Sequence, residues 1–249
     1  MIRGIYTAAS GMSTHLKNQE IISNNLANAD TAGFKRDQLV ITSFREFLIN
    51  RINDPKDQGH APLIGSYSLG TEPLGTYTDH SEGGIISTER KFDVAIQGDG
   101  FFVIDTPQGE QYTRAGSFYL SNEQTLVTSE GYPVLGENGL VTITDENFII
   151  GPEGEVVVDG TIVNRLLIVD LPPQAMIKSG DSLWRVEGEG GAAPATGYKI
   201  VQGHLESSNV NVVKEMVDMI AGMRTYEANQ KTLVMQDETL GRLISELAR

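Results

Sequence analysis

The sequence predicts an α+β chain, in which two terminal helices form an antiparallel coiled-coil-like pair and an all-β domain is inserted between them. Apolar residues recur at helical spacing at both ends, and short strand-like runs bounded by Gly, Asn, Asp and Pro fill the middle. No long helical pattern separates those runs. We expect a discontinuous helical domain at residues 1–36 and 206–249, an extended linker at 37–80 and an all-β domain at 81–205.

The N-terminal segment has a narrow apolar row at spacings of three and four residues. A polar Gln19 interrupts this row, whose members are Ile2, Ile5, Ala9, Met12, Leu16, Ile22 and Leu26. Small side chains at residues 8–11 allow a neighbouring helix to approach closely. Gly33 follows a polar run and fits a turn after the helix.

The C-terminal segment carries a longer row with the a/d spacing of a heptad repeat. Its members are Val212, Met216, Met219, Met223, Tyr226, Gln230, Leu233, Asp237, Leu240, Ile244 and Leu247. Residues 207–209, a Ser-Ser-Asn run, are expected to cap this helix. Because a narrow seam gives a helix little stability alone, the two ends need each other or a partner.

The middle of the chain has the pattern of an all-β domain. Strands are predicted at residues 92–96, 100–104, 140–143, 156–158 and 165–171. Hairpin turns are predicted at residues 98–100, 137–139 and 153–154. The preceding linker begins with an apolar stretch at 44–52 and continues with a run rich in Gly and Pro.

Composition excludes several classes of partner and chemistry. The net charge of −14 argues against nucleic acid and against anionic lipid as partners. Residues 37–210 alone have a net charge of −15, so the acidic excess lies in the middle of the chain. The absence of cysteine excludes disulfide and thiolate chemistry. No apolar run reaches the length of a membrane span, and the first residues lack the apolar core of a signal peptide, so we expect no membrane insertion.

Residue patterns for catalysis or metal binding are weak. The Gly-Asp-Gly at 98–100 lacks the Gly-Lys-Ser/Thr of a phosphate loop, and the histidines at 15, 60, 80 and 204 have no ligand spacing. Asp93, Asp99 and Asp105 do not match a calcium loop, and Asp93 and Asp105 are expected to face solvent from strands. We expect no catalytic residue, cofactor or metal, and no enzyme. Whether the fold brings two carboxylates together as a catalytic pair stays open.

Three regions together resemble the flagellar basal-body rod and hook protein family. The N-terminal motifs lie at residues 7–12, 23–28 and 33–35, the middle motifs at 92–102 and 112–118, and the C-terminal motifs at 205–210, 215–220 and 224–229. The matches run from end to end and keep their order.

The resemblance implies a structural subunit of the flagellar basal-body rod. It implies export in an unfolded state by the flagellar type III apparatus, without a cleaved signal peptide, and helical assembly with other rod subunits through the terminal helices, in the rod that crosses the periplasm. Residues 131–139 are similar to the FlgF type of the proximal rod, which we favour over the FlgG type of the distal rod. We expect mobile termini in the free subunit, since burial between subunits must offset the entropy of ordering them.

The expected assembly interface consists of residues from both helical rows and from the asparagine-rich end of the first helix. Its members are Ile5, Ala9, Met12, Leu16, Asn24, Asn25, Leu26, Asn28, Val212, Met216, Met219, Met223, Tyr226, Asn229, Leu233, Leu240, Ile244 and Leu247. Methionine suits a seam with non-identical neighbours, but the pattern leaves open whether that seam lies within one chain or between chains. For the asparagines, a contact between subunits is favoured over a plain polar face.

Two other classes of function compete with this interpretation. A secreted β enzyme would need a cleft with paired acids and would not need the helices. A coiled-coil adaptor would form a closed complex of fixed stoichiometry instead of an open polymer. The motifs at both ends of the chain disfavour both.

Overall fold

The computed structural model describes residues 2–50, 63–145, 147–173, 175–187 and 191–247. Contacts divide the chain into two compact units. We call residues 1–27, 37–79 and 211–249 the helix–ribbon unit, and residues 28–36 and 80–210 the β unit. This division differs from the expected domains in placing 28–36 with the β strands and 37–79 with the helices. Each unit is described by itself.

The helix–ribbon unit contains the two helices, α1 (Ile2–Ala27) and α2 (Val212–Leu247), so the predicted terminal helices with a mostly β middle region are confirmed. The cap of α2 is Asn211: its Oδ1 accepts a hydrogen bond from Lys214 N at 3.0 Å, and its carbonyl accepts one from Glu215 N at 2.9 Å. The prediction of a cap at 207–209 is therefore wrong. Within the described residues, neither helix is both long and apolar enough to cross a membrane.

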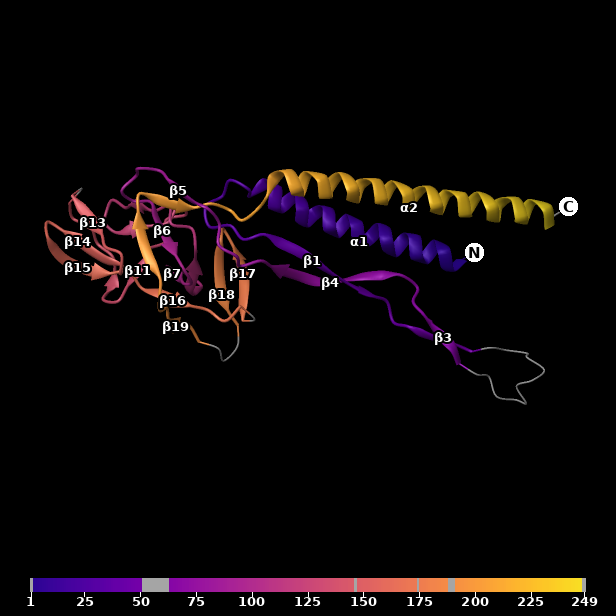
Figure 1. Cartoon of the computed structure of the whole chain (residues 1–249), viewed down its shortest axis with the longest axis horizontal. Helices are drawn as coiled ribbons and strands as arrows, with labels where there is room; N and C mark the ends of the chain where they lie inside the picture. Colours follow the sequence, from indigo (N-terminus) through magenta and orange to yellow (C-terminus); the bar gives the residue numbers. More distant parts are fainter. Residues whose placement is uncertain (1, 51–62, 146, 174, 188–190, 248–249) are drawn as a thin grey trace. The chain divides into compact units, whose positions relative to one another are not determined.

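A β ribbon completes this unit (Figure 1). Strand β1 (Asp37–Ser43) pairs antiparallel with β4 (Thr71–Thr78), and β2 (Phe47–Asn50) pairs antiparallel with β3 (Leu63–Tyr67). Two threonines one heptad apart on α1 hold the ribbon: Thr7 Oγ1 donates to Leu69 O at 3.0 Å, and Thr14 Oγ1 donates to Thr71 O at 3.3 Å. Residues 51 and 52 of the predicted apolar stretch, and His60, lie outside the described residues.

The β unit is built around a six-stranded antiparallel sheet in the order β17-β18-β8-β7-β16-β19. The bounds of these strands are β17 Met176–Gly180, β18 Leu183–Val186, β8 Gly109–Thr113, β7 Phe101–Thr106, β16 Ile168–Asp170 and β19 Ala193–Pro194. A three-stranded sheet contains β13 (Phe148–Ile150), β14 (Glu155–Val158) and β15 (Thr161–Arg165). Four two-stranded pairs join β5 (Ile85–Ser87) with β21 (His204–Glu206), β6 (Val94–Gln97) with β20 (Lys199–Gln202), β9 (Tyr119–Leu120) with β10 (Leu126–Val127), and β11 (Leu135–Gly136) with β12 (Gly139–Leu140).

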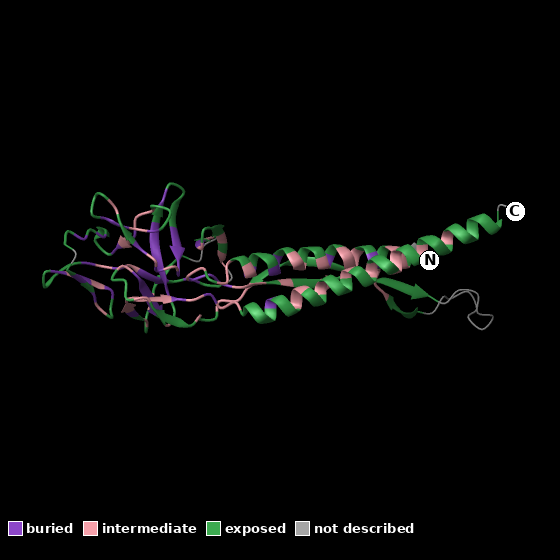
Figure 2. Ribbon diagram, turned by 90° about the horizontal axis from the view of Figure 1, so that it is seen from above, coloured by how far each residue is buried: buried purple, intermediate pink, exposed green. Residues whose placement is uncertain are grey.

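Strand β7 is buried on both faces, which explains its unbroken apolar run. Phe102 and Ile104 belong to the larger core cluster, whereas Phe101 and Val103 belong to a second cluster that includes Trp184. Figure 2 shows the buried residues concentrated in the β unit, while the helices are mostly exposed or partly exposed. The β unit therefore has a conventional core, and the helix–ribbon unit does not.

The structure confirms two of the three predicted hairpin turns. Strands β11 and β12 pair across residues 137–138, and β13 and β14 pair across 151–154. The hairpin at 98–100 is wrong, because β6 pairs with β20 and not with β7. The predicted strand at 140–143 is reduced to Leu140 at the end of β12 and a single bridge at Thr142. Asp93 was expected to face solvent, yet it is 1% exposed, with its Oδ1 3.6 Å from an Arg90 nitrogen.

Candidate assembly interface

Helices α1 and α2 run side by side in opposite directions (Figure 1), and three pairs with polar side chains lie along the contact between them. Gly4 faces Gln236, Gly11 faces Asn229, and Asn25 bonds Glu215. Each step between these pairs is one or two heptads on both helices. A Cβ on Gly11 would lie 2.9 Å from Asn229 Nδ2, so glycine is what permits the close approach. We call these six residues the polar seam.

Asn25 ties the polar seam to the ribbon. Its Nδ2 donates to Asp37 O at 2.8 Å and to Glu215 Oε2 at 3.2 Å, while its Oδ1 accepts from Asp37 N at 3.0 Å. Asn25 is 0% and Glu215 1% exposed, and Glu215 lies in the first turn of α2, where the helix dipole favours a negative charge. The asparagine therefore joins α1, α2 and β1 of one chain.

The opposite side of α2 carries large apolar side chains that are exposed in this structure. Val213 is 72%, Val217 59% and Ile220 60% exposed, and Met216 and Met223 are 47% and 46% exposed. Their spacing places them on one side of the helix, away from Glu215 and Asn229. We call these five residues the outer row. Its exposure is unusual, because a helix normally turns its apolar side toward its own core.

The expected interface residues fall into three groups in this structure. Eight are exposed: Ala9, Leu16, Asn24, Val212, Met216, Met223, Ile244 and Leu247. Nine are partly buried: Ile5, Met12, Leu26, Asn28, Met219, Tyr226, Asn229, Leu233 and Leu240. Asn25 is buried, and Asn28 belongs to the β unit.

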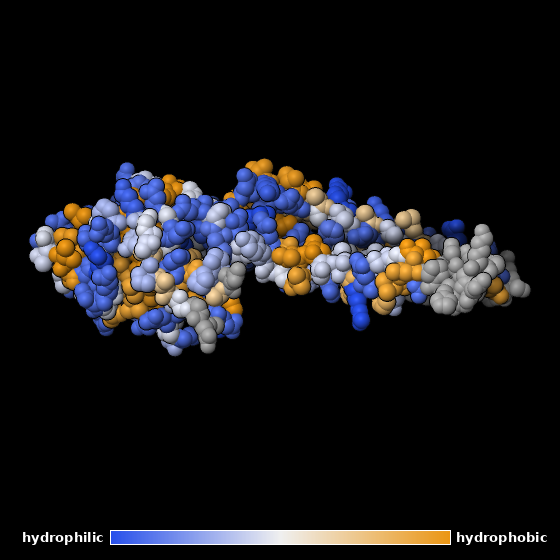
Figure 3. Space-filling model, turned by 60° about the horizontal axis from the view of Figure 1, so that its bottom comes forward, coloured by the Kyte–Doolittle hydropathy of each residue, from blue (hydrophilic) through white to orange (hydrophobic). Residues whose placement is uncertain are grey.

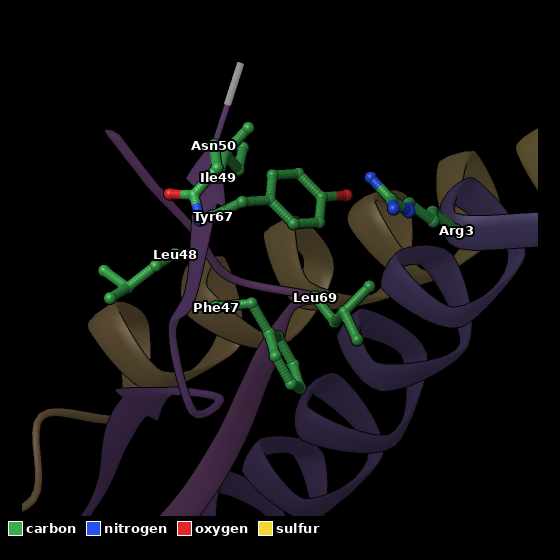
Figure 4. Close-up of a pocket in the computed structure, with 7 residues that line it drawn as sticks. All are labelled: Arg3, Phe47, Leu48, Ile49, Asn50, Tyr67 and Leu69. Atoms are coloured by element: carbon green, nitrogen blue, oxygen red, sulfur yellow. The ribbon is translucent and has the colours of Figure 1, made fainter. Parts of the chain in front are cut away.

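A second apolar surface lies where the ribbon passes the start of α1. A cavity of about 400 Å³ is lined by Arg3, Phe47, Leu48, Ile49, Asn50, Tyr67 and Leu69 (Figure 4). We call it the hairpin groove. Phe47 is 54% and Leu48 70% exposed, and Figure 3 shows apolar side chains gathered on the described part of this hairpin. The guanidinium carbon of Arg3 lies 5.7 Å from the centre of the Tyr67 ring, a cation–π contact.

The β unit contains a buried ionic cluster of Lys35, Arg114 and Glu206. Glu206 Oε1 accepts from Lys35 Nζ at 2.6 Å and from Gly83 N at 3.0 Å, and Glu206 Oε2 accepts from an Arg114 nitrogen at 3.3 Å. The side chains of Lys35 and Glu206 are 2% exposed, and that of Arg114 is 5% exposed. This glutamate cluster joins the segment after α1 to the strand that precedes α2. Sequence reasoning missed it, because a lone glutamate carries no signal of burial.

Three groups in the β unit have shifted pKa values. Burial raises the pKa of the Tyr112 hydroxyl, with a smaller contribution from Glu110. Burial also raises the pKa of Tyr198, and the hydrogen bond to Glu155 is the main cause of the raised pKa of Arg165. Within the described residues, no group of three His, Asp or Glu side chains is placed to hold a metal ion.

Family models match three stretches of the chain. A model described as "Flagella basal body rod protein" matches residues 5–35, one described as "Flagellar hook protein FlgE/F/G D1 domain" matches 95–158, and one described as "Flagellar basal body rod FlgEFG protein C-terminal" matches 201–246. The first and last include most of α1 and α2, and the middle one lies within the β unit.

Curated relatives match over nearly the full length. The flagellar basal-body rod protein FlgG of Bacillus subtilis is 34% identical, over 98% of this chain and 99% of the relative. The flagellar basal-body rod protein FlgF of Salmonella typhimurium is 32% identical, over 97% of each chain, and the flagellar hook-basal body complex protein FlhO of Bacillus subtilis is 28% identical over 100% of both. The chain therefore belongs to the flagellar basal-body rod protein family and is a structural subunit of the rod.

Proposed function

We propose that this subunit polymerises through its terminal helices, with the outer row of α2 buried against other subunits. The observation that carries the proposal is the polarity of the helix pair. Glycine, asparagine, glutamine and glutamate form the polar seam within the chain, while the valine, isoleucine and methionine side chains of the outer row point away from it. We further propose that α1 and α2 pair as an antiparallel coiled coil along that seam.

The energies favour assembly. Full burial of one such apolar side chain contributes about 1.5–3 kcal/mol. Outer-row members are between 46% and 72% exposed, so covering them contributes roughly 1 kcal/mol each, or roughly 5 kcal/mol for each helix. A polar seam contributes less, since each hydrogen bond that it forms replaces one with water. Burial of the outer row is therefore the favourable term that must offset the entropy cost of association between copies.

Within the expected interface, we propose different roles for the groups found above. The eight exposed residues contact other subunits directly. Asn25 acts inside its own subunit, because its side chain has no exposed surface and its bonds fix the start of α2 against α1.

The remaining proposals follow from family membership. We propose that the flagellar type III apparatus exports the chain unfolded, without a cleaved signal peptide, into the rod, and that its partners are further copies and other rod subunits, with neither nucleic acid nor membrane. We propose a structural and not an enzymatic role, as the family membership implies; the described lining of the hairpin groove offers one cation, one amide, one phenol and apolar side chains. Identity to relatives named FlgG and FlgF is nearly equal, at 34% and 32%, so the FlgF type stays a prediction.

Sedimentation of the full chain tests the proposed polymerisation. Ile220→Lys places a charge in the outer row, and Thr225→Lys places the same charge at an exposed polar position on the same helix. We expect extended polymers, alone or with other rod proteins, from the parent and from Thr225→Lys, and mostly monomer from Ile220→Lys. As a control for folding, circular dichroism should give equal helix content for the two variants at concentrations at which neither polymerises. Equal sedimentation of both variants would contradict a role for the outer row.

A further inference from the structure

The last turns of α2 and the hairpin groove have complementary surfaces. We propose that the hairpin groove receives the end of α2, residues 240–247, from a second copy of the chain. This inference rests on the proposed polymerisation and names one contact within it.

The hairpin groove is an apolar surface, and Phe47 and Leu48 in its lining are exposed. Its cavity of about 400 Å³ is within the range in which proteins enclose small molecules. Of the described residues that line it, none comes from α2, and Arg3 alone is charged. Figure 4 shows the Tyr67 ring directed toward Arg3 along one side of the groove, with Phe47 and Leu69 nearby. An occupant must therefore be apolar and carry a negative charge toward Arg3.

The end of α2 extends beyond the start of α1. Gly4 faces Gln236, and α1 begins at Ile2, so in this antiparallel register α2 has passed the described part of α1 by Leu240. It continues to Leu247, a further length of about 12 Å at 1.5 Å per residue. Nothing from α1 lies opposite this overhang within the described residues.

The overhang is apolar on one side. Leu240, Leu243, Ile244 and Leu247 follow at spacings of three and four, and the last two are 67% and 86% exposed. Leu240, Leu243 and Leu247 continue the side of α2 that faces α1 further back along the helix, and Ile244 lies three heptads after Met223 of the outer row. These apolar side chains match the apolar lining of the hairpin groove, and Leu243, Ile244 and Leu247 are exposed, whereas Leu240 is partly buried.

Charge favours one orientation of the overhang in the groove. The last turn of α2 has no basic residue within its described part, it contains Glu246, and the terminal carbonyl groups of a helix carry partial negative charge. The first turn of α1 has no acidic residue and contains Arg3, near the positive end of that helix. Arg242 lies one turn before Glu246, so attraction toward Arg3 comes from the final turn of the overhang and its carbonyl groups, and not from the net charge of residues 240–247.

The groove and the overhang are different surfaces, and the proposed polymerisation requires that their contact be head-to-tail and not a closed two-fold exchange. Each copy offers one of each, and such a contact builds an open polymer unless rotation closes it into a ring. The inference thereby supplies a second contact between copies, in addition to the covering of the outer row.

Cross-linking between singly substituted copies tests the contact, because the parent chain has no cysteine. A tagged Leu48→Cys population is mixed with an untagged Ile244→Cys population, allowed to polymerise with the same additions as the parent, and treated with a short bismaleimide. The control replaces Ile244→Cys by Val213→Cys, which lies on the same helix and is similarly exposed, at 72% against 67%. We expect a tagged–untagged product with Ile244→Cys several-fold above the control, and only in the sedimenting fraction.

The outcomes separate this inference from the proposed function. If polymers sediment but Ile244→Cys cross-links no better than Val213→Cys, the groove contact is wrong and polymerisation stands. If the parent forms no polymer, the proposed function fails and this inference fails with it. If a cysteine substitution itself prevents polymerisation, an exchange of charges between the two surfaces tests the contact instead. Arg3→Glu should raise the concentration needed for polymers several-fold, and the double variant Arg3→Glu with Glu246→Arg should lower it again. If the double variant needs the same concentration to polymerise as Arg3→Glu alone, the groove contact is wrong.

Discussion

Removing the charge of Glu206 should destabilise the β unit strongly. Glu206→Gln keeps the shape of the side chain but leaves Lys35 and Arg114 without their carboxylate at positions that are 2% and 5% exposed. Removing one partner from a buried ion pair costs about 3–5 kcal/mol, because the remaining charge stays desolvated. The side-chain amide cannot compensate for two cations. We therefore expect a large loss from a substitution that changes almost no volume.

The single tryptophan reports this loss directly. Trp184 is 3% exposed in the β unit, so its fluorescence follows unfolding of that unit during urea titration of the full chain. With a urea dependence of about 1–3 kcal/mol per molar, the midpoint should fall by roughly 1–5 M, or the unit should be unfolded without urea. Arg165→Met is the matched control: it breaks a bond to Glu155, but the Arg165 side chain is 37% exposed, and its loss should cost about 1 kcal/mol or less. A Glu206→Gln midpoint equal to that of the control would refute the reasoning.

Three further predictions concern single positions. Gly33→Ala should lower the stability of the β unit in the same fluorescence assay, since Gly33 has φ +67° and an added Cβ would lie 2.5 Å from the backbone of Ala115; a neutral result would contradict that geometry. Asn211→Ala removes the cap of α2 and should cost about 1 kcal/mol, seen as roughly five-fold faster hydrogen exchange at Lys214, whose amide bonds the Asn211 side chain; unchanged exchange would argue against the cap. Burial raises the pKa of Tyr112 above its ordinary value of 10.0, so its contribution to stability is fully present below pH 10.0 and is lost as pH rises through the folded pKa. Tyr112→Phe should therefore lose less stability than the parent as the pH is raised above 10.0, and equal losses would contradict the assignment.

The heptad pattern predicted the existence of α2 but not which side of it the chain itself would use. Met219, Tyr226 and Leu233 belong to the predicted row, and they also lie beside the polar seam, where they are partly buried. On one side of that shared line lie Met216 and Met223, exposed. On the other lie the polar members of the seam. An apolar pattern shows that a surface is to be buried, but not whether the same chain or another one buries it.

The β unit shows the same limit for residues far apart in sequence. Turn residues at 137–139 and 153–154 predicted hairpins correctly, because each joins neighbouring strands. The Gly-Asp-Gly at 98–100 makes a turn too, yet β6 pairs with β20, about a hundred residues later, and local chemistry does not select that partner. Glu206 was missed for a related reason: its burial depends on Lys35 and Arg114, which only the tertiary fold brings to it.

The most direct test of the central claim is oxidation of individual methionines before and after polymerisation, measured by mass spectrometry. Met216 and Met223 lie in the outer row and are 47% and 46% exposed, while Met176 lies in the β unit and serves as the internal reference. If other subunits cover the outer row, oxidation of Met216 and Met223 should slow several-fold in sedimented polymer relative to Met176. Unchanged oxidation of both methionines in material that clearly sediments would contradict assembly through this side of α2.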